Sequence, residues 1–166
     1  MDIKQTFKKS VKAFLLIFVF VWLFSFFQKD LLTHDKIWLM IVIVIFASIF
    51  QPDYSPFKKA EDEKDKGTAL QIIWSVYLSQ AAILADVVFL NYELATPWSW
   101  YAAVAAVVAV LGLLLRSWAF HELGAFFTWH ISVTSSQTVV DTGPYRLMAH
   151  PGYTGALLTY VATGVM

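Results

Sequence analysis

The segment from Asp141 to Gly155, DTGPYRLMAHPGYTG, carries most of the side chains in this chain that could do chemistry. It is polar and rich in turn-forming residues, and it lies between two very apolar stretches. His150 precedes a proline, a position that disfavours helical backbone. The segment therefore predicts a kink that brings polar and aromatic side chains into an apolar protein. These side chains are Tyr145, Arg146, His150 and Tyr153.

Helix-start signals come before the kink. Thr142 is a residue type that caps helices, and Pro144 suits a first helical turn because it lacks an N–H. We expect a short helix over residues 145–149, which ends at the His150–Pro151 pair.

A second helix is predicted to begin at Pro151, where Gly152 and Gly155 would let a backbone or a ligand approach closely. His150 and Tyr153 are three residues apart and can face the same way. The N–H groups and the positive dipole at a helix start favour an anionic group such as a carboxylate. The aromatic rings of the segment favour a cation. A ligand with both a carboxylate and a positive centre fits this corner.

The run GPYRLMAHPGYTG resembles the signature of the isoprenylcysteine carboxyl methyltransferases and their bacterial relatives, which are membrane enzymes that use S-adenosylmethionine. The preceding run LRSWAFHELGAFFT, residues 115–128, resembles the segment that these proteins carry just before the signature. The two blocks cover residues 114–155, roughly a quarter of the chain. The resemblance implies that the cofactor is held by Gly143, Pro144, Tyr145, His150, Pro151 and Tyr153.

The chain departs from the family pattern in two places. Family members usually carry an arginine before the His-Pro pair, and here that position is Ala149. They also continue with more membrane helix and an acidic, aromatic segment that completes the cofactor pocket, whereas this sequence stops at Met166. We therefore expect a truncated chain in which that half of the site is missing.

Arg116 is the candidate for acceptor binding. A charged side chain within an apolar helix is costly and usually faces a cavity or a partner, although snorkelling to the interface is an alternative. The resemblance implies that Arg116 binds the carboxylate to be methylated, and its planar guanidinium suits both carboxylate oxygens. Because methyl transfer to an anion needs alignment more than a base, His121, Glu122 and His130 are expected mostly to line the interface.

The elements that position these residues are predicted to be membrane helices. The chain is 58% hydrophobic and 17% aromatic, with a mean hydropathy of +0.62, which is typical of a polytopic membrane protein. Its net charge is zero, so nucleic-acid binding is not supported. The absence of cysteine excludes disulfides and thiolate metal sites, and the four histidines lack metal-ligand spacing, so no metal site is expected.

We predict an all-α integral membrane bundle of four spans and the start of a fifth, in a single domain over residues 1–166. Residues 1–50 form an N-terminal helical hairpin, residues 51–68 a charged loop, and residues 69–166 a methyltransferase-like core that is incomplete at its C-terminus. The spans are expected over residues 13–27, 37–50 (with a start as early as 31), 69–90 and about 98–122, with the fifth beginning at Pro151.

Lysine and arginine placement predicts the orientation of the bundle. Alternate sides of the membrane carry nine against two of these residues, and the rich side should be cytoplasmic. The charged loop and the 141–155 segment then face the cytoplasm. Asp86 falls near the opposite face, so it is expected to be interfacial or water-exposed rather than paired with Arg116. Small residues in the fourth span predict close packing against another helix: Ala102, Ala105, Ala106, Ala109 and Gly112.

The predicted function is methyl transfer from S-adenosylmethionine to the carboxylate of a lipidated or small amphipathic substrate, by resemblance a C-terminal prenylcysteine. The bilayer would deliver the lipid tail and the cytoplasm the cofactor, in the endoplasmic reticulum of a eukaryote or the inner membrane of a bacterium. One alternative is a related membrane enzyme, either a phospholipid N-methyltransferase or an NADPH-dependent reductase. A reductase is expected to carry an acidic residue at the position of Ala156. The other alternative is a non-catalytic membrane fragment.

Overall fold

The computed structural model describes residues 3–50, 68–90, 97–127 and 139–166. Every regular element within these ranges is helical, which confirms the predicted all-α class. The long helices of the described residues are α1 (Ile3–Ser25), α2 (Asp35–Phe50), α3 (Thr68–Phe89), α5 (Trp100–Leu123) and α6 (Pro151–Val165), and the short 3₁₀ turns are η1 (Leu31–Thr33), η2 (Gly124–Phe126) and η3 (Gly143–Arg146).

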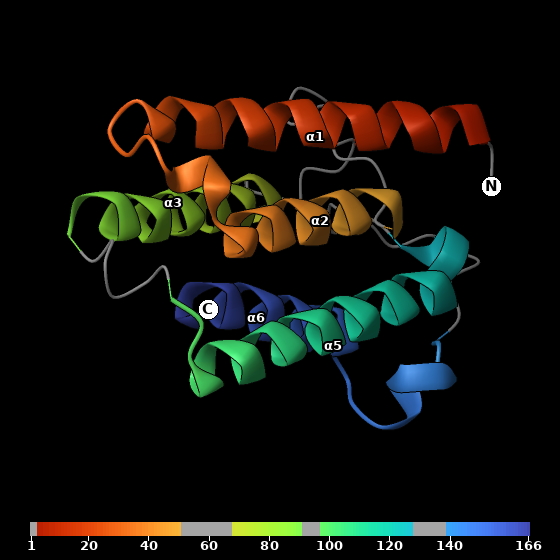
Figure 1. The fold of residues 1–166 in the computed structure, drawn as a ribbon. Helices are drawn as coiled ribbons and strands as arrows, with labels where there is room; N and C mark the ends of the chain where they lie inside the picture. Colours follow the sequence, from red (N-terminus) through yellow and green to blue (C-terminus); the bar gives the residue numbers. More distant parts are fainter. Residues whose placement is uncertain (1–2, 51–67, 91–96, 128–138) are drawn as a thin grey trace.

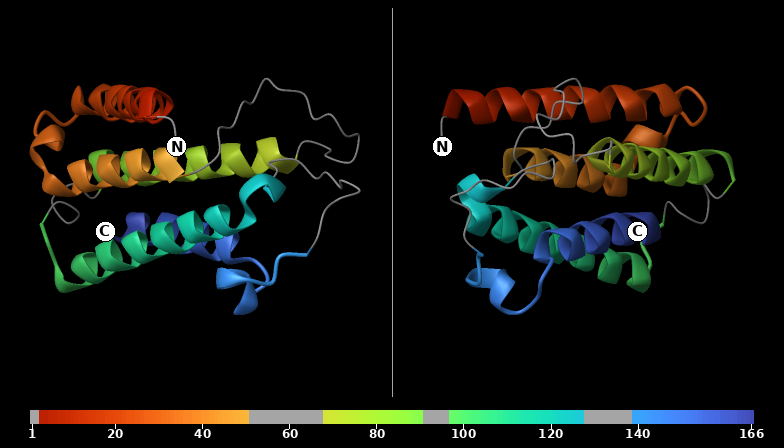
Figure 2. Two further views of the ribbon diagram at one scale, coloured as in Figure 1. Left: turned by 90° about the vertical axis from the view of Figure 1, so that its right-hand side faces the viewer. Right: turned by 180° about the vertical axis from the view of Figure 1, so that it is seen from behind.

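The helices lie in three layers, with α2 and α3 in the middle (Figure 1 and Figure 2). Helix α1 covers one side of this middle layer, and α5 with α6 covers the other. The start of α1 lies at the same end of the bundle as the end of α5 and the turn η3. The basic N-terminal residues and the His-Pro segment are therefore at one end of the molecule.

Local sequence signals explain where the helices begin. Helix α1 extends back to Ile3, well before the predicted apolar run, because the lysines that precede that run are good helix formers. Helix α2 begins at Asp35, whose carboxylate accepts a hydrogen bond from the backbone N–H of Lys36 at 3.0 Å. Helix α5 begins after Ser99, whose hydroxyl accepts one from the N–H of Ala102 at 3.2 Å.

Two helices of the described residues are long and apolar enough to cross a membrane, over Leu70–Phe89 and Trp100–Leu123. They correspond to the third and fourth predicted spans. Helices α2 and α6 have 16 and 15 residues, or roughly 24 and 22 Å at the standard helical rise. The count of four spans and the start of a fifth stays a prediction. So does the loop over residues 51–68, which lies outside the described residues except for Thr68 in α3.

The outer surface of the helices is apolar, as lipid contact requires. Large side chains such as Leu16, Trp74 and Leu111 are 65%, 57% and 57% exposed. Helices that are hydrophobic on all sides are typical of membrane spans. Two interior clusters of the described residues hold the layers together. The first joins α1, α2 and α3 through Val21, Leu31, Ile37, Ile41, Leu84 and Val88, and the second joins α2, α5 and α6 through Ile43, Ala105, Ala109, Leu113 and Ala162.

Among the described helices, α5 and α6 make the most extensive contact, and small residues make it possible. A Cβ on Gly112 would lie 2.7 Å from the carbonyl oxygen of Gly155, so the two backbones are in contact at this crossing. One turn along α6, the hydroxyl of Thr159 donates to the carbonyl of Ala109 at 3.2 Å. This confirms the close packing predicted from the small residues of the fourth span.

Candidate cofactor site

The predicted break at the His150–Pro151 pair is present. His150 precedes the first residue of α6 with φ −133° and ψ 59°, outside the helical region, and Pro151 occupies the first turn. The backbone carbonyl of His150 accepts hydrogen bonds from the N–H and the hydroxyl of Thr154 at 3.0 and 3.1 Å. Helix α6 therefore begins at Pro151, directly after the kink, and its first N–H groups point back toward the kink.

The imidazole of His150 and the phenol of Tyr153 share one side of this helix start, as predicted. Their ring centroids are 6.0 Å apart with an angle of 70° between the ring planes. Both side chains are exposed. The pair therefore presents aromatic faces to the outside of the bundle beside the first turn of α6.

The prediction of a short helix over residues 145–149 is wrong. The chain instead forms the 3₁₀ turn η3 over Gly143–Arg146. Gly143 has a left-handed φ of +55°, which redirects the backbone before the turn, and Pro144 is fully buried behind it. A single tight turn fits between this glycine and the His-Pro pair, so no α-helix develops.

The predicted capping role of Thr142 is also wrong. Thr142 precedes η3 but makes no side-chain capping bond. Its hydroxyl donates to the Oε1 carboxylate oxygen of Glu122, in the last turn of α5. The other carboxylate oxygen lies against Gly143, since a Cβ there would be 2.6 Å from Oε2. Glu122 was expected mostly to line the interface. It is separated by 20 residues from Thr142, and no local pattern connects the two.

Arg116 contacts the start of α6. Its Nη1 donates to the carbonyl oxygen of Gly152 at 2.8 Å, and its guanidinium carbon lies 4.7 Å from the ring centroid of Phe120. The backbone N–H and Cβ of Arg116 also pack on Gly155, where a Cβ would be 2.7 and 2.9 Å from them. The structure thus brings Arg116 to the kink, as the predicted site requires.

Gly152 does not provide the predicted close approach. Among the described residues, a Cβ on Gly152 would meet only the Cβ of Ala119 within 4 Å, at 3.8 Å, which is ordinary contact. The close approach falls at Gly155 alone. Gly152 contributes through its carbonyl oxygen instead, because this is the acceptor for Arg116.

Tyr145 is half-buried within η3, and its backbone N–H donates to the carbonyl of Thr142 at 3.1 Å. Burial raises the pKa of its phenol. The phenol is therefore neutral near pH 7 and can both donate and accept a hydrogen bond. Among the other expected interface residues, His121 is exposed, and His130 lies outside the described residues.

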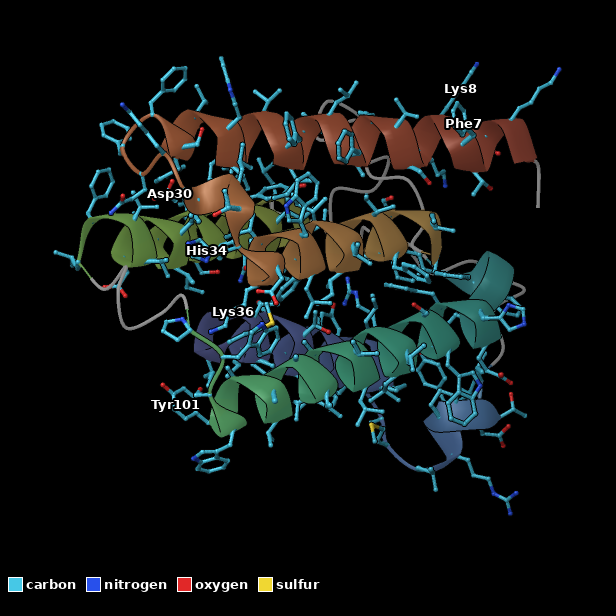
Figure 3. All side chains as sticks on the ribbon, in the orientation of Figure 1. Phe7, Lys8, Asp30, His34, Lys36 and Tyr101 are labelled. Atoms are coloured by element: carbon cyan, nitrogen blue, oxygen red, sulfur yellow. The ribbon has the colours of Figure 1, made fainter. Side chains whose placement is uncertain are left out.

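A cavity of about 230 Å³ lies at the opposite end of the bundle, between α2, α3, α5 and α6. Its lining includes His34, Lys36 and Tyr101, which Figure 3 shows near the start of α2 and of α5, and none of the predicted site residues. Asp86 also lines it and is exposed, so it lies away from Arg116, as expected from the topology. The candidate cofactor site is an open surface around the kink rather than this cavity.

Comparison with known proteins places these features in a family. The model of the isoprenylcysteine carboxyl methyltransferase (ICMT) family matches residues 104–166, which include Arg116, η3 and α6. The chain is 30% identical over 127 residues to the uncharacterized protein YpbQ of Bacillus subtilis, and the match covers 73% of each chain. No solved structure gives a significant match.

Two plant relatives carry names that state an activity. A probable protein-S-isoprenylcysteine O-methyltransferase of Oryza sativa is 36% identical over 70 residues, 40% of this chain and 37% of the rice protein. Protein-S-isoprenylcysteine O-methyltransferase B of Arabidopsis thaliana is 31% identical over 94 residues, 55% of this chain and 47% of the plant protein. The chain thus spans less than half the length of either plant relative.

This chain belongs to the isoprenylcysteine carboxyl methyltransferase family. The family is membrane-bound, in agreement with the two long apolar helices.

Proposed function

We propose that this chain binds S-adenosylmethionine at the His150 kink and methylates the carboxylate of a lipidated substrate in the bilayer. The observation that carries the proposal is the contact between α5 and the kink. Arg116 of α5 donates to the backbone one residue past Pro151, while the rings of His150 and Tyr153 stand on the outside of the same helix start. A cation, an aromatic pair and a helix N-terminus therefore lie together.

The residues at the kink suit the charges of S-adenosylmethionine. The start of α6 has no side-chain capping bond, so its first N–H groups and the positive helix dipole suit the carboxylate of the amino-acid part. The aromatic faces of Tyr145 and Tyr153 suit a positive centre. The Gly143–Pro144 turn, His150 and Pro151 would complete the contacts with the cofactor. Bound there, S-adenosylmethionine would supply an electrophilic methyl group.

Arg116 would orient the acceptor carboxylate. A guanidinium has five N–H donors in a planar fork. The hydrogen bond from Nη1 to the carbonyl of Gly152 fixes the plane of the Arg116 guanidinium against α6. The carboxylate is already an anion near pH 7, so the chain has to align and desolvate it rather than deprotonate it. The acceptor suggested by the family would be a C-terminal prenylcysteine, whose tail would reach the site from the lipid.

The proposed site faces the cytoplasm, in a multi-pass protein of the endoplasmic reticulum or of a bacterial inner membrane. Support comes from the lysines in the first turns of α1. Lys8 of α1 is at the same end as η3 (Figure 3), and cytoplasmic ends of membrane proteins are enriched in lysine and arginine. This end would be in contact with the water-soluble cofactor.

The direct test is a binding measurement by calorimetry on the purified chain in nanodiscs. We expect S-adenosylmethionine to bind, His150→Ala to weaken binding at least tenfold, and His34→Ala, at the opposite end, to bind like wild type. A separate titration with NADPH tests the reductase alternative. Equal binding to wild type and His150→Ala, no binding to either, or binding of NADPH alone would overturn the proposal.

A further inference from the structure

The carboxylate of Glu122 links the end of α5 to the turn η3. Its Oε1 accepts a hydrogen bond from the hydroxyl of Thr142, the residue before the turn. A Cβ on Gly143 would lie 2.7 Å from the Cδ of Glu122, so the carboxylate fills the space beside this glycine. Glu122 is half-buried in this position.

The geometry of Gly143 explains why this contact matters for the turn. With φ at +55°, Gly143 adopts a backbone conformation that other residues rarely adopt. In its observed position the carboxylate of Glu122 also occupies space that a Cβ would need, so with a side chain at position 143 the Glu122 side chain would have to shift. The glycine and the glutamate therefore fit one another, and together they set the direction in which the chain enters η3.

Helix α5 thus holds the His-Pro segment from both sides. Glu122 holds Thr142 and Gly143 ahead of the segment, and Arg116 holds the carbonyl of Gly152 behind it. Tyr145 and His150, both proposed cofactor contacts, lie on the chain between these two attachments.

We propose, on the basis of the proposed cofactor site, that Glu122 is a positioning residue that sets η3 and Tyr145 for S-adenosylmethionine binding. Glu122 acts through Thr142 rather than on the reacting atoms. A role as a general base is not needed, since the acceptor carboxylate has no proton to lose near pH 7. The requirement is for a hydrogen-bond acceptor of the right shape, and a neutral amide oxygen meets it as well as a carboxylate.

This requirement separates a positioning role from a charge or base role. Glu122→Gln keeps an acceptor oxygen for Thr142, whereas Glu122→Ala removes it. Thr142→Val removes the donor at nearly constant shape, and Thr142→Ser keeps it. We expect the dissociation constant for S-adenosylmethionine to rise about tenfold in Glu122→Ala and Thr142→Val, and to stay within about threefold of wild type in Glu122→Gln and Thr142→Ser. The Glu122→Ala, Thr142→Val double variant should be no weaker than either single one.

A second measurement does not depend on the cofactor. Amide hydrogen exchange of residues 139–149 in the ligand-free chain should be faster in Glu122→Ala and Thr142→Val and unchanged in Glu122→Gln. His121→Ala, an exposed neighbour on α5, should leave this exchange unchanged. The inference is overturned if Glu122→Ala leaves the exchange unchanged, or if Glu122→Gln binds the cofactor as weakly as Glu122→Ala. Failure of the cofactor site itself would appear differently, as wild-type protein with the expected exchange pattern and no binding.

Discussion

The backbones of Gly112 and Gly155 are in contact where α5 crosses α6. A Cβ on Gly155 would lie 2.5 Å from the carbonyl oxygen of Gly112. Arg116 follows Gly112 by one helical turn on the same face of α5, so this crossing places its guanidinium at the start of α6. The position of the proposed acceptor-binding residue therefore depends on two glycines.

The first prediction concerns this crossing. Gly155→Ala should destabilise the protein by about 1–3 kcal/mol, because its methyl group would meet rigid backbone atoms of α5. Gly152→Ala is the matched control, since its methyl group would meet only Ala119 at 3.8 Å. Thermal unfolding in detergent is the measurement. Equal melting temperatures for the two variants would contradict backbone contact at Gly155.

The second prediction separates the hydrogen bond that Arg116 donates to Gly152 from its proposed binding of the acceptor carboxylate. Arg116→Lys keeps a cation that can donate to Gly152 but loses the planar fork. With a synthetic S-prenyl cysteine as acceptor, we expect its KM for the acceptor to rise roughly 10- to 100-fold while cofactor affinity changes little. Arg116→Met, which loses the bond to Gly152 as well, should weaken both. A KM for the acceptor that is unchanged in Arg116→Lys would remove the carboxylate-binding role.

The third prediction concerns Ala149, where the family usually has arginine. Ala149 is exposed, so a longer side chain fits without displacing its neighbours. Ala149→Arg should tighten S-adenosylmethionine binding about two- to fivefold, as expected for a partly solvated charge pair with the cofactor carboxylate. Ala149→Gln supplies similar bulk without charge. If the two variants bind alike, the position does not act through charge.

The fourth prediction is the titration of Tyr145. Burial raises the pKa of its phenol in the folded protein above that in the unfolded chain. The stabilisation from the neutral phenol is therefore complete below the ordinary tyrosine value of about 10 and is lost as pH rises through the higher folded-state pKa. A difference ultraviolet titration of wild type against Tyr145→Phe should show one tyrosine that ionises above pH 10. A difference titration centred at or below 10 would contradict burial of the phenol.

Features that depend on residues close together in the sequence could be predicted. The break at His150–Pro151 follows from proline sterics, and the small residues of the fourth span, Ala105, Ala109 and Gly112, gave the packing face of α5. The helix ends were harder, since the lysine-rich start of α1 carries no apolar signal although lysine favours helix.

Contacts between residues distant in the sequence could not be predicted. The short α-helix expected after Pro144 depends on capping by Thr142, but the hydroxyl of Thr142 reaches Glu122 instead. The acceptor of Arg116 is a backbone carbonyl 36 residues away, and backbone groups are identical in every residue. Neither Glu122 as the partner of Thr142 nor Gly152 as the partner of Arg116 can be recognised from composition or periodicity.

Photolabelling tests the central claim, that S-adenosylmethionine binds at the His150 kink, most directly. The purified chain would be irradiated with methyl-tritiated S-adenosylmethionine and its labelled peptides identified by mass spectrometry. The proposed site predicts a label within residues 141–155 that excess unlabelled S-adenosylhomocysteine displaces. A displaceable label that lies instead among the residues of the cavity at the opposite end, or a folded chain that takes up no displaceable label, would contradict it.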